Sequence, residues 1–315
     1  MKAFVLPDES TPATIQELPD PEPGPGEVRV AVKASSVNGM DVFVATGMAK
    51  GMMEHRYPVV VGRDYSGVVD AVGSNVSGFG VGDEVTGIAP PEQHLGRGTY
   101  ANYIVVPAEG FIEPKPSSLS FEQAASVGLA ALTALVAVKA VDASAGKVVL
   151  VAGATGGVGS YAVQIAARRG ATVIATSLPE DEEWIRSLGA SEVVDYRSDV
   201  AETVRTSRPD GIDALIDAVN RGDAHGSLAE LVKKGGYVAS TTGSADAEAL
   251  DVRGVGAANV FAQGDPADFA EVVRMAGDGE LQVPIKRTFS FEELPEALGL
   301  VGSRSSRGKF AIKVA

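Results

Sequence analysis

Residues 148–169, VVLVAGATGGVGSYAVQIAARR, decide the fold. The stretch opens as a continuous apolar strand, passes through a turn that contains four glycines, and ends as a helix with an apolar face. Dinucleotide sites have this order, because a turn without Cβ atoms lets the backbone approach a pyrophosphate, whose charge the helix N-terminus favours. Against the pattern G-x-G-x-x-G the register is residues 154–159, with Ala154 at the first glycine. We predict that this turn binds a dinucleotide; a purely structural strand–helix turn is the alternative.

The segments after this turn repeat the alternation of strand and helix. We expect further strands at residues 171–176, 192–195, 214–218 and 236–241. We expect helices at residues 160–169, 180–188, 201–205 and 226–234. This βαβ alternation predicts an α/β protein with a doubly wound parallel sheet, in a Rossmann domain over residues 120–261.

The first hundred residues have a different pattern. Short apolar segments alternate with turns that contain glycine or proline, and residues 27–33, EVRVAVK, have the two-residue period of a half-buried strand. We therefore predict a compact β-rich domain over residues 1–119.

The composition excludes several kinds of site. The 315 residues include no cysteine, so disulfides, thiolate catalysis, iron–sulfur clusters and cysteine-bound zinc are excluded together. The three histidines, His55, His94 and His225, have no metal-ligand spacing, and we expect them at the surface. A net charge of −14 argues against nucleic acid or an anionic membrane as a partner. No signal-peptide pattern is visible at the start, so we expect a cytoplasmic protein.

The end of the second Rossmann strand indicates which dinucleotide is bound. An NAD site usually has an acidic residue there, whereas this chain has Ser177, which leaves room for a 2′-phosphate. Tyr196 and Arg197 follow the next strand and could contact that phosphate. The acidic residues 180–183 argue the other way, unless they only form the first turn of a helix. We expect NADPH, with NADH left open.

Further motifs extend the pattern over essentially the whole chain. Residues 37–41 read V-N-G-M-D, residues 61–69 read V-G-R-D-Y-S-G-V-V, and residues 78–85 read G-F-G-V-G-D-E-V. Together with the glycine loop, they resemble the zinc-independent quinone oxidoreductases of the medium-chain dehydrogenase/reductase superfamily. The resemblance implies a GroES-like catalytic domain, made from residues 1–119 and completed by residues 262–315. It also implies a cleft between this domain and the Rossmann domain.

The resemblance also implies a chemistry. Zinc-dependent relatives hold their metal with Cys, His or Glu side chains, whereas the matching positions here carry Asn38 and the segment Gly62-Arg63-Asp64. We therefore expect no metal, and hydride transfer from NADPH to a quinone or another activated α,β-unsaturated carbonyl. The alternatives are a biosynthetic enoyl reductase and a cofactor-binding protein with little turnover. RNA binding is known in the family, but the net charge argues against it. The family also implies a homodimer through a Rossmann edge strand near residues 254–261.

The residues expected at the site follow from these motifs. Asn38 and Asp41 are candidate catalytic residues that contact the nicotinamide ribose or the acceptor oxygen; alternatively, they cap a loop. Phe43 and Tyr100 are candidates for the substrate pocket, although a packed aromatic is the commoner explanation of Tyr100. We expect Asp217 to bind loop N–H groups. The expected cofactor-binding residues are Thr133, Thr155, Gly156, Gly157, Val158, Gly159, Ser177, Tyr196, Arg197, Gly243, Phe261 and Lys309.

Overall fold

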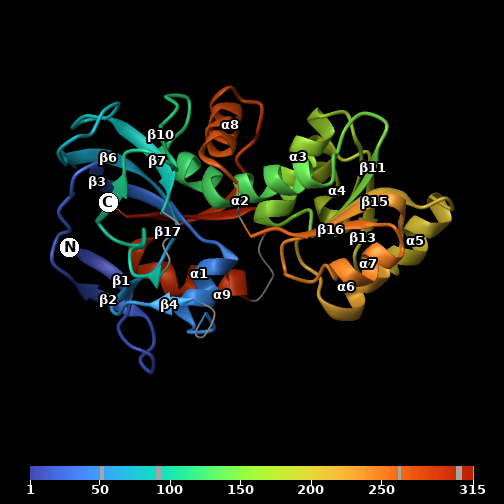
Figure 1. Ribbon diagram of the computed structural model, residues 1–315, viewed down its shortest axis with the longest axis horizontal. Coiled ribbons are helices and arrows are strands. Elements are labelled where there is room, and N and C mark those ends of the chain that lie inside the picture. The colour runs from blue at the N-terminus through green and yellow to red at the C-terminus, as the bar shows by residue number, and fades with distance from the viewer. Residues whose placement is uncertain (50–52, 90–93, 262–263, 303–306, 315) are drawn as a thin grey trace. The chain divides into compact units, whose positions relative to one another are not determined.

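A computed structural model describes residues 1–49, 53–89, 94–261, 264–302 and 307–314 (Figure 1). The chain divides into two compact units. Unit 1 comprises Met1–Leu129 and Asp265–Ala315, and unit 2 comprises Ala130–Gly264. The first border therefore lies later than the expected border after residue 119, inside a long helix.

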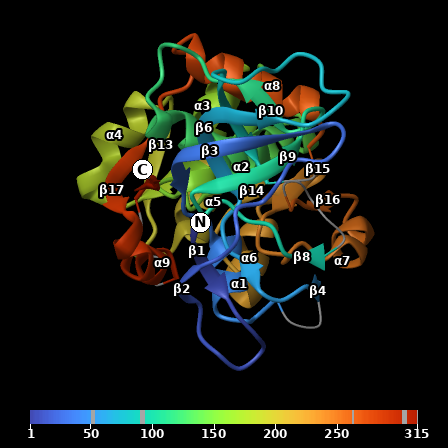
Figure 2. The same cartoon turned by 90° about the vertical axis from the view of Figure 1, so that its left-hand side faces the viewer.

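Unit 1 is built mainly from β-strands. Its seven-stranded sheet has the order β10 (Ile112–Pro114), β7 (Glu84–Ile88), β6 (Asp64–Val72), β3 (Glu27–Ser36), β18 (Lys309–Lys313) and β17 (Ile285–Ser290), with β9 (Tyr103–Pro107) also paired to β3. In Figure 2 the strands β3 and β9 run beside each other across this unit. Smaller sheets are formed by β1 (Lys2–Leu6), β2 (Thr14–Glu17) and β5 (Val59–Val60), and by β4 (Glu54–His55) and β8 (His94–Leu95).

Strand β3 shows how the sequence pattern builds this unit. Val28, Val30 and Val32 are buried, and the residues between them are partly exposed, as the two-residue period predicts. The C-terminal strand β18 pairs antiparallel with the end of β3, so the tail of the chain lies inside the N-terminal sheet. The helices of unit 1 are α1 (Gly39–Ala45), α8 (Pro266–Gly277), α9 (Leu294–Gly302) and the short 3-10 helix η2 (Phe291–Glu293).

Unit 2 has the predicted doubly wound parallel sheet. The strand order is β13 (Glu192–Asp195), β12 (Thr172–Ser177), β11 (Val148–Ala152), β14 (Ile212–Asp217), β15 (Val232–Ser240) and β16 (Gly256–Asn259). One face is covered by α3 (Gly157–Arg168) and α4 (Glu182–Ser187), and the other by α5 (Val200–Ser207), α6 (Gly222–Ala229) and α7 (Ala247–Val252) (Figure 1). This order is that of a Rossmann sheet, whose ligands bind outside the carboxyl ends of the strands.

Two local predictions need correction. The helix expected at residues 226–234 ends at Ala229, because Val232 already pairs with Ile212 in the parallel sheet. The helix expected at residues 180–188 begins with a 3-10 turn, η1 (Pro179–Asp181), and continues as α4. Proline at the first position of η1 fits there, because the missing N–H has no partner in a helix start.

A long helix, α2 (Phe121–Ala140), begins in unit 1 and ends in unit 2. Gly128 has non-helical angles, φ −13° and ψ −113°, and a Cβ there would lie 2.2 Å from Asp64 Oδ1. The kink brings the N–H of Leu129 to 2.7 Å from the same oxygen. By length and composition, α2 is the one helix of the described residues that could cross a membrane. However, 72% of that window is buried inside the protein, as in a core helix.

Candidate functional site

The glycine loop of unit 2 has the geometry of a phosphate cradle. Gly153 has φ +77°, which favours glycine, and a Cβ on Gly159 would lie 2.1 Å from Gly153 O. Gly156 caps α3 without any side-chain hydrogen bond, so no side chain competes for the first N–H groups of the helix. The residues present therefore fit a dinucleotide, whose pyrophosphate the N–H groups of Gly157, Val158 and Gly159 would hold.

Two loops at the carboxyl edge of the same sheet surround this turn. A Cβ on Gly153 would lie 3.0 Å from Val219 Cβ, so the loop after β14 lies directly against the glycine loop. The loop after β15 is joined to it by Thr242 Oγ1, which donates to Asn220 O at 2.7 Å. Gly243 has φ +77° and lies against the ring of Phe261, which is 53% exposed.

Asp217 anchors the loop after β14. Its Oδ1 accepts hydrogen bonds from the N–H groups of Val219 and Asn220 at 3.1 and 2.9 Å, as expected from the sequence. Its Oδ2 lies 2.8 Å from Nδ1 of His225, which is only 3% exposed. The prediction that His225 lies at the surface is therefore wrong, because α6 turns it back onto the end of β14. His55 is partly buried, and the side chain of His94 lies outside the described residues.

At the end of β12, where the ribose is expected, the structure places a second carboxylate, that of Asp195. Ser177 is fully buried, and its Oγ donates to Leu178 O at 2.9 Å. Its register partner on β13 is Asp195, and Arg197 binds that carboxylate through Nε at 3.1 Å and Nη2 at 2.7 Å. These bonds hold the pKa of Asp195 below its usual range. Tyr196 is 52% exposed beside them. Arg197 could therefore meet a 2′-phosphate only while it also balances Asp195.

The remaining residues expected to bind the cofactor in unit 2 have less specific surroundings. Thr133 is 7% exposed in α2, and Thr155 is partly buried in the glycine loop. The acidic residues 180–183 form η1 and the first turn of α4, where Glu182 bonds to Arg186 at 2.8 Å. This arrangement supports the interpretation of the acidic run as a helix start.

Unit 1 contains a buried cluster of polar side chains. Asn38 Oδ1 accepts from Lys309 Nζ at 2.6 Å, and Asn38 Nδ2 donates to Asp64 Oδ2 at 2.8 Å. Asp41 Oδ2 accepts from Asn38 N at 2.8 Å and from the hydroxyl of Tyr100 at 3.0 Å. Lys309 Nζ also bonds to Val37 O at 3.0 Å and lies 3.5 Å from Asp64 Oδ2. We call Asn38, Asp41, Asp64, Tyr100 and Lys309 the buried cluster.

Burial controls the charges of this cluster. Burial, and then the charge of Asp64, raise the pKa of Asp41 to about 6. Burial also lowers the pKa of Lys309 and raises that of Tyr100 well above its usual value. Asp41 Oδ1 is buried without a hydrogen-bond partner among the described residues. The cluster therefore holds two carboxyl groups and one ammonium group that are almost completely removed from solvent.

These contacts change the assignment of four predicted site residues. Asn38 and Asp41 form a capping box at the start of α1, which supports the capping interpretation over contact with an acceptor. Tyr100 is 0% exposed with its hydroxyl on Asp41, which favours the interpretation as a packed aromatic over a place in the substrate pocket. Lys309 is 2% exposed and its three N–H donors face three acceptors, so it has none left for a cofactor phosphate.

Phe43, the other predicted pocket residue, lies on α1. It is partly buried and packs against the apolar core of unit 1. Sequence reasoning missed Asp64, Asp195 and the buried position of His225. Asp64 lies in the motif at residues 61–69 that was quoted for the resemblance, and Lys309 was expected to bind the cofactor, but neither observation predicted their contact.

A metal does not fit the buried cluster. Among the described residues, no group of three His, Cys, Asp or Glu side chains could hold a metal ion. Asp41 and Asp64 do come together, but the ammonium of Lys309 lies on their shared partner Asn38. This ammonium would repel a metal cation, so the cluster does not form a metal site.

Two family models match the chain. One, described as an alcohol dehydrogenase GroES-like domain, covers residues 24–117, and one described as a zinc-binding dehydrogenase covers residues 188–312. The NAD(P)H oxidoreductase RTN4IP1, mitochondrial, of Bos taurus is 32% identical over 331 residues, covering 92% of this chain and 82% of the relative. The trans-enoyl reductase tndF of Aspergillus flavipes is 37% identical over 229 residues, covering 67% of this chain and 64% of the relative.

A solved structure agrees with these matches. The quinone oxidoreductase from Coxiella burnetii has a TM-score of 0.90 and 29% identity, over 100% of this chain and 99% of that chain. The fold is thus the predicted α/β class, with a GroES-like and a Rossmann domain. The chain belongs to the quinone oxidoreductases of the medium-chain dehydrogenase/reductase superfamily.

Proposed function

We propose that the protein is an NADPH-dependent reductase of quinones or other activated α,β-unsaturated carbonyls, and that it works without zinc. One observation carries the proposal. Helix α3 begins at the carboxyl edge of a Rossmann sheet without a side-chain cap, directly after the turn in which Gly153 and Gly159 approach each other closely. This geometry suits a dinucleotide pyrophosphate. The reduced nicotinamide supplies the hydride when the cofactor is bound.

The residues of unit 2 bind and orient the dinucleotide. The N–H groups of α3 hold the pyrophosphate, and the loops after β14 and β15 restrict the space beside the glycine loop. Catalysis then rests on orientation and proximity, which can supply much of the rate enhancement of a hydride transfer. In unit 1 the buried cluster fixes the start of α1, and we assign Asn38 and Asp41 to positioning.

NADPH rather than NADH is supported by Ser177, which brings no negative charge to the end of β12. Asp195 opposes this choice, although Arg197 balances its charge. Titration of both cofactors into the protein, followed by nicotinamide fluorescence, tests the preference. Tighter binding of NADPH is expected, and equal or tighter binding of NADH would refute it.

The acceptor is tested by steady-state oxidation of NADPH. We expect turnover with 1,4-benzoquinone and with simple 2-enones. An enoyl reductase is the second candidate, because the chain is similar to a protein named as a trans-enoyl reductase. Turnover confined to enoyl thioesters would select that candidate, and no turnover with any acceptor would leave only cofactor binding.

Zinc independence is supported by the position of the Lys309 ammonium in the buried cluster. After dialysis against 1,10-phenanthroline, and with the removal of metal verified by metal analysis, the rate of quinone reduction should be unchanged. Activity that is lost on dialysis and restored by zinc would contradict this part of the proposal.

We also propose a homodimer through the edge strand β16. Val252 and Phe261, which flank this strand in sequence, are 89% and 53% exposed. An open strand edge beside exposed apolar side chains is a pairing liability unless another subunit covers it. Light scattering at micromolar concentration should give twice the chain mass.

A further inference from the structure

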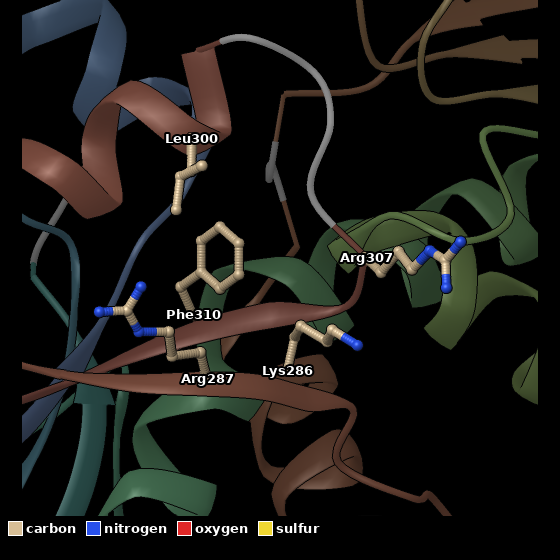
Figure 3. A pocket seen from close by; sticks show the side chains of 5 residues that line it. All are labelled: Lys286, Arg287, Leu300, Arg307 and Phe310. Atoms are coloured by element: carbon tan, nitrogen blue, oxygen red, sulfur yellow. The ribbon is translucent and has the colours of Figure 1, made fainter.

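Unit 1 contains a cavity of about 410 Å³ that the proposed function does not use. It is lined by Lys286, Arg287, Leu300, Arg307 and Phe310 (Figure 3). Its volume lies within the range of small-molecule sites. Among the described residues, the lining combines three cationic and two apolar side chains, in a chain with a net charge of −14.

A β-bulge places two successive cations on this cavity. In the parallel pair of β17 and β18, Ile285 is opposite Lys309 and Arg287 is opposite Phe310, so Lys286 is an extra residue without a partner. Successive side chains of a regular strand point to opposite faces, whereas a bulge redirects one of them. Lys286 and Arg287 therefore both line the cavity.

The lining residues have different roles. Arg287 is held by Glu296 at 2.7 Å and Glu293 at 3.1 Å, and its guanidinium lies 4.0 Å from the ring centre of Phe289. Its charge is balanced, so it forms a fixed wall. Lys286 and Arg307 extend on the other side of the Phe310 ring, and Leu300 lies across from that ring (Figure 3).

Protection of the sheet edge explains only part of this arrangement. β17 is the last strand of the described sheet, and charged side chains on such a strand prevent pairing with other chains. That role accounts for Lys286 and Arg287. It does not account for Arg307, which precedes the inner strand β18, nor for the apolar side chains of Phe310 and Leu300 in the lining.

We propose that this cavity binds an organic anion, namely a carboxylate or phosphate carried on an apolar body. Lys286 would bind the charged group, because an ammonium group forms charge-assisted hydrogen bonds with such oxygens, and the guanidinium of Arg307 adds positive charge to the same lining. Phe310 and Leu300 would contact the apolar body. All of these lining residues belong to unit 1, so binding of the anion does not require the dinucleotide site of unit 2.

The probe is 4-fluorophenyl phosphate, and its binding is followed by ¹⁹F NMR titration of the 315-residue chain. A ligand of this size is expected to bind with a dissociation constant of about 1 mM. Lys286→Gln should weaken binding by about tenfold, because one charge-assisted hydrogen bond is lost. Lys313→Gln is the matched control, because it removes the same charge from an exposed position of β18 outside the cavity.

Two further probes test the charged group and the apolar body separately: 4-fluorobenzyl alcohol lacks the charge, and inorganic phosphate lacks the apolar body. 4-Fluorobenzyl alcohol should bind more than tenfold more weakly, and inorganic phosphate should displace 4-fluorophenyl phosphate only at much higher concentration. Equal binding of the alcohol, or an unchanged affinity in Lys286→Gln, would overturn the proposal. Complete displacement of the probe by stoichiometric NADPH would also overturn it, because the cavity would then belong to the cofactor site. None of these three results would bear on quinone turnover.

Discussion

The buried carboxyl group of Asp41 makes the stability of unit 1 depend on pH. The charged and titratable groups around it are Asp64, Lys309 and Tyr100. Because burial and Asp64 raise its pKa from the usual 3.8 to about 6, the folded state binds its proton more tightly than the unfolded state does. The stabilisation from protonated Asp41 is therefore complete below pH 3.8 and is lost as the pH rises through about 6.

The size of the effect follows from the same pKa. At 1.36 kcal/mol per pH unit, the rise to about 6 corresponds to about 3 kcal/mol of unfolding free energy. About 2 kcal/mol of this falls between pH 4.5 and pH 8. Asp41→Asn retains an oxygen for Asn38 N and the Tyr100 hydroxyl but does not ionise. We therefore expect the unfolding free energy of this variant, relative to wild type, to rise by about 2 kcal/mol over that interval.

Guanidinium unfolding at several pH values measures this difference. Circular dichroism follows both units, whereas the fluorescence of Trp184, the single tryptophan, follows unit 2. Asp199→Asn, which alters the exposed N-cap of α5, is the control and should show no such rise. A difference between Asp41→Asn and wild type that stays constant from pH 4.5 to pH 8 would refute the reasoning.

Substitutions at four other positions test the cofactor site, the buried cluster and the proposed dimer. Ser177→Asp should weaken NADPH binding at least tenfold and spare NADH, since like charges a few ångströms apart cost about 1–4 kcal/mol; parallel loss of both cofactors in fluorescence titrations would contradict this. Gly159→Ala should weaken both cofactors at least tenfold, because its Cβ would lie 2.1 Å from Gly153 O; unchanged dissociation constants would show that the turn can shift. Lys309→Met should lower the unfolding free energy by about 3–5 kcal/mol, because it leaves the buried Asp64 carboxylate without its cation, and adding Asp64→Asn should restore part of this loss. Denaturant titrations that show no restoration in the double variant would contradict an energetic coupling between Lys309 and Asp64. Val252→Asp should halve the mass found by light scattering, and an unchanged dimer mass would place the interface elsewhere.

The Rossmann half could be predicted because its signals are local. An apolar strand, a glycine turn and a helix start follow one another within residues 148–169, and each constrains the next. The position of Ser177 at the end of β12 follows from the same spacing. Asp195 was missed because it meets Ser177 only through the pairing of β12 with β13, which the sequence does not specify residue by residue.

The buried cluster could not be predicted in the same way. Lys309 reaches Asn38 across 271 positions of sequence, and no local pattern encodes that contact. A lysine before a closing strand has the same sequence pattern whether it points to solvent or into the core. Asn38 and Asp41 at the start of α1 were likewise expected at a catalytic site. In the sequence, a capping Asn–Asp pair cannot be told from a catalytic pair, because the two differ only in what their side chains face.

The cluster also bears on which acceptor the enzyme reduces. A catalytic metal polarises a carbonyl oxygen because it keeps one coordination position open for substrate. Lys309 has three N–H donors, and these face Val37 O, Asn38 Oδ1 and Asp64 Oδ2, so none is left for a substrate oxygen. The Lys309 ammonium is therefore not available to polarise an acceptor carbonyl. A quinone or a conjugated enone is already electron-poor and needs less polarisation than a simple ketone to take a hydride, which supports the proposed substrate class.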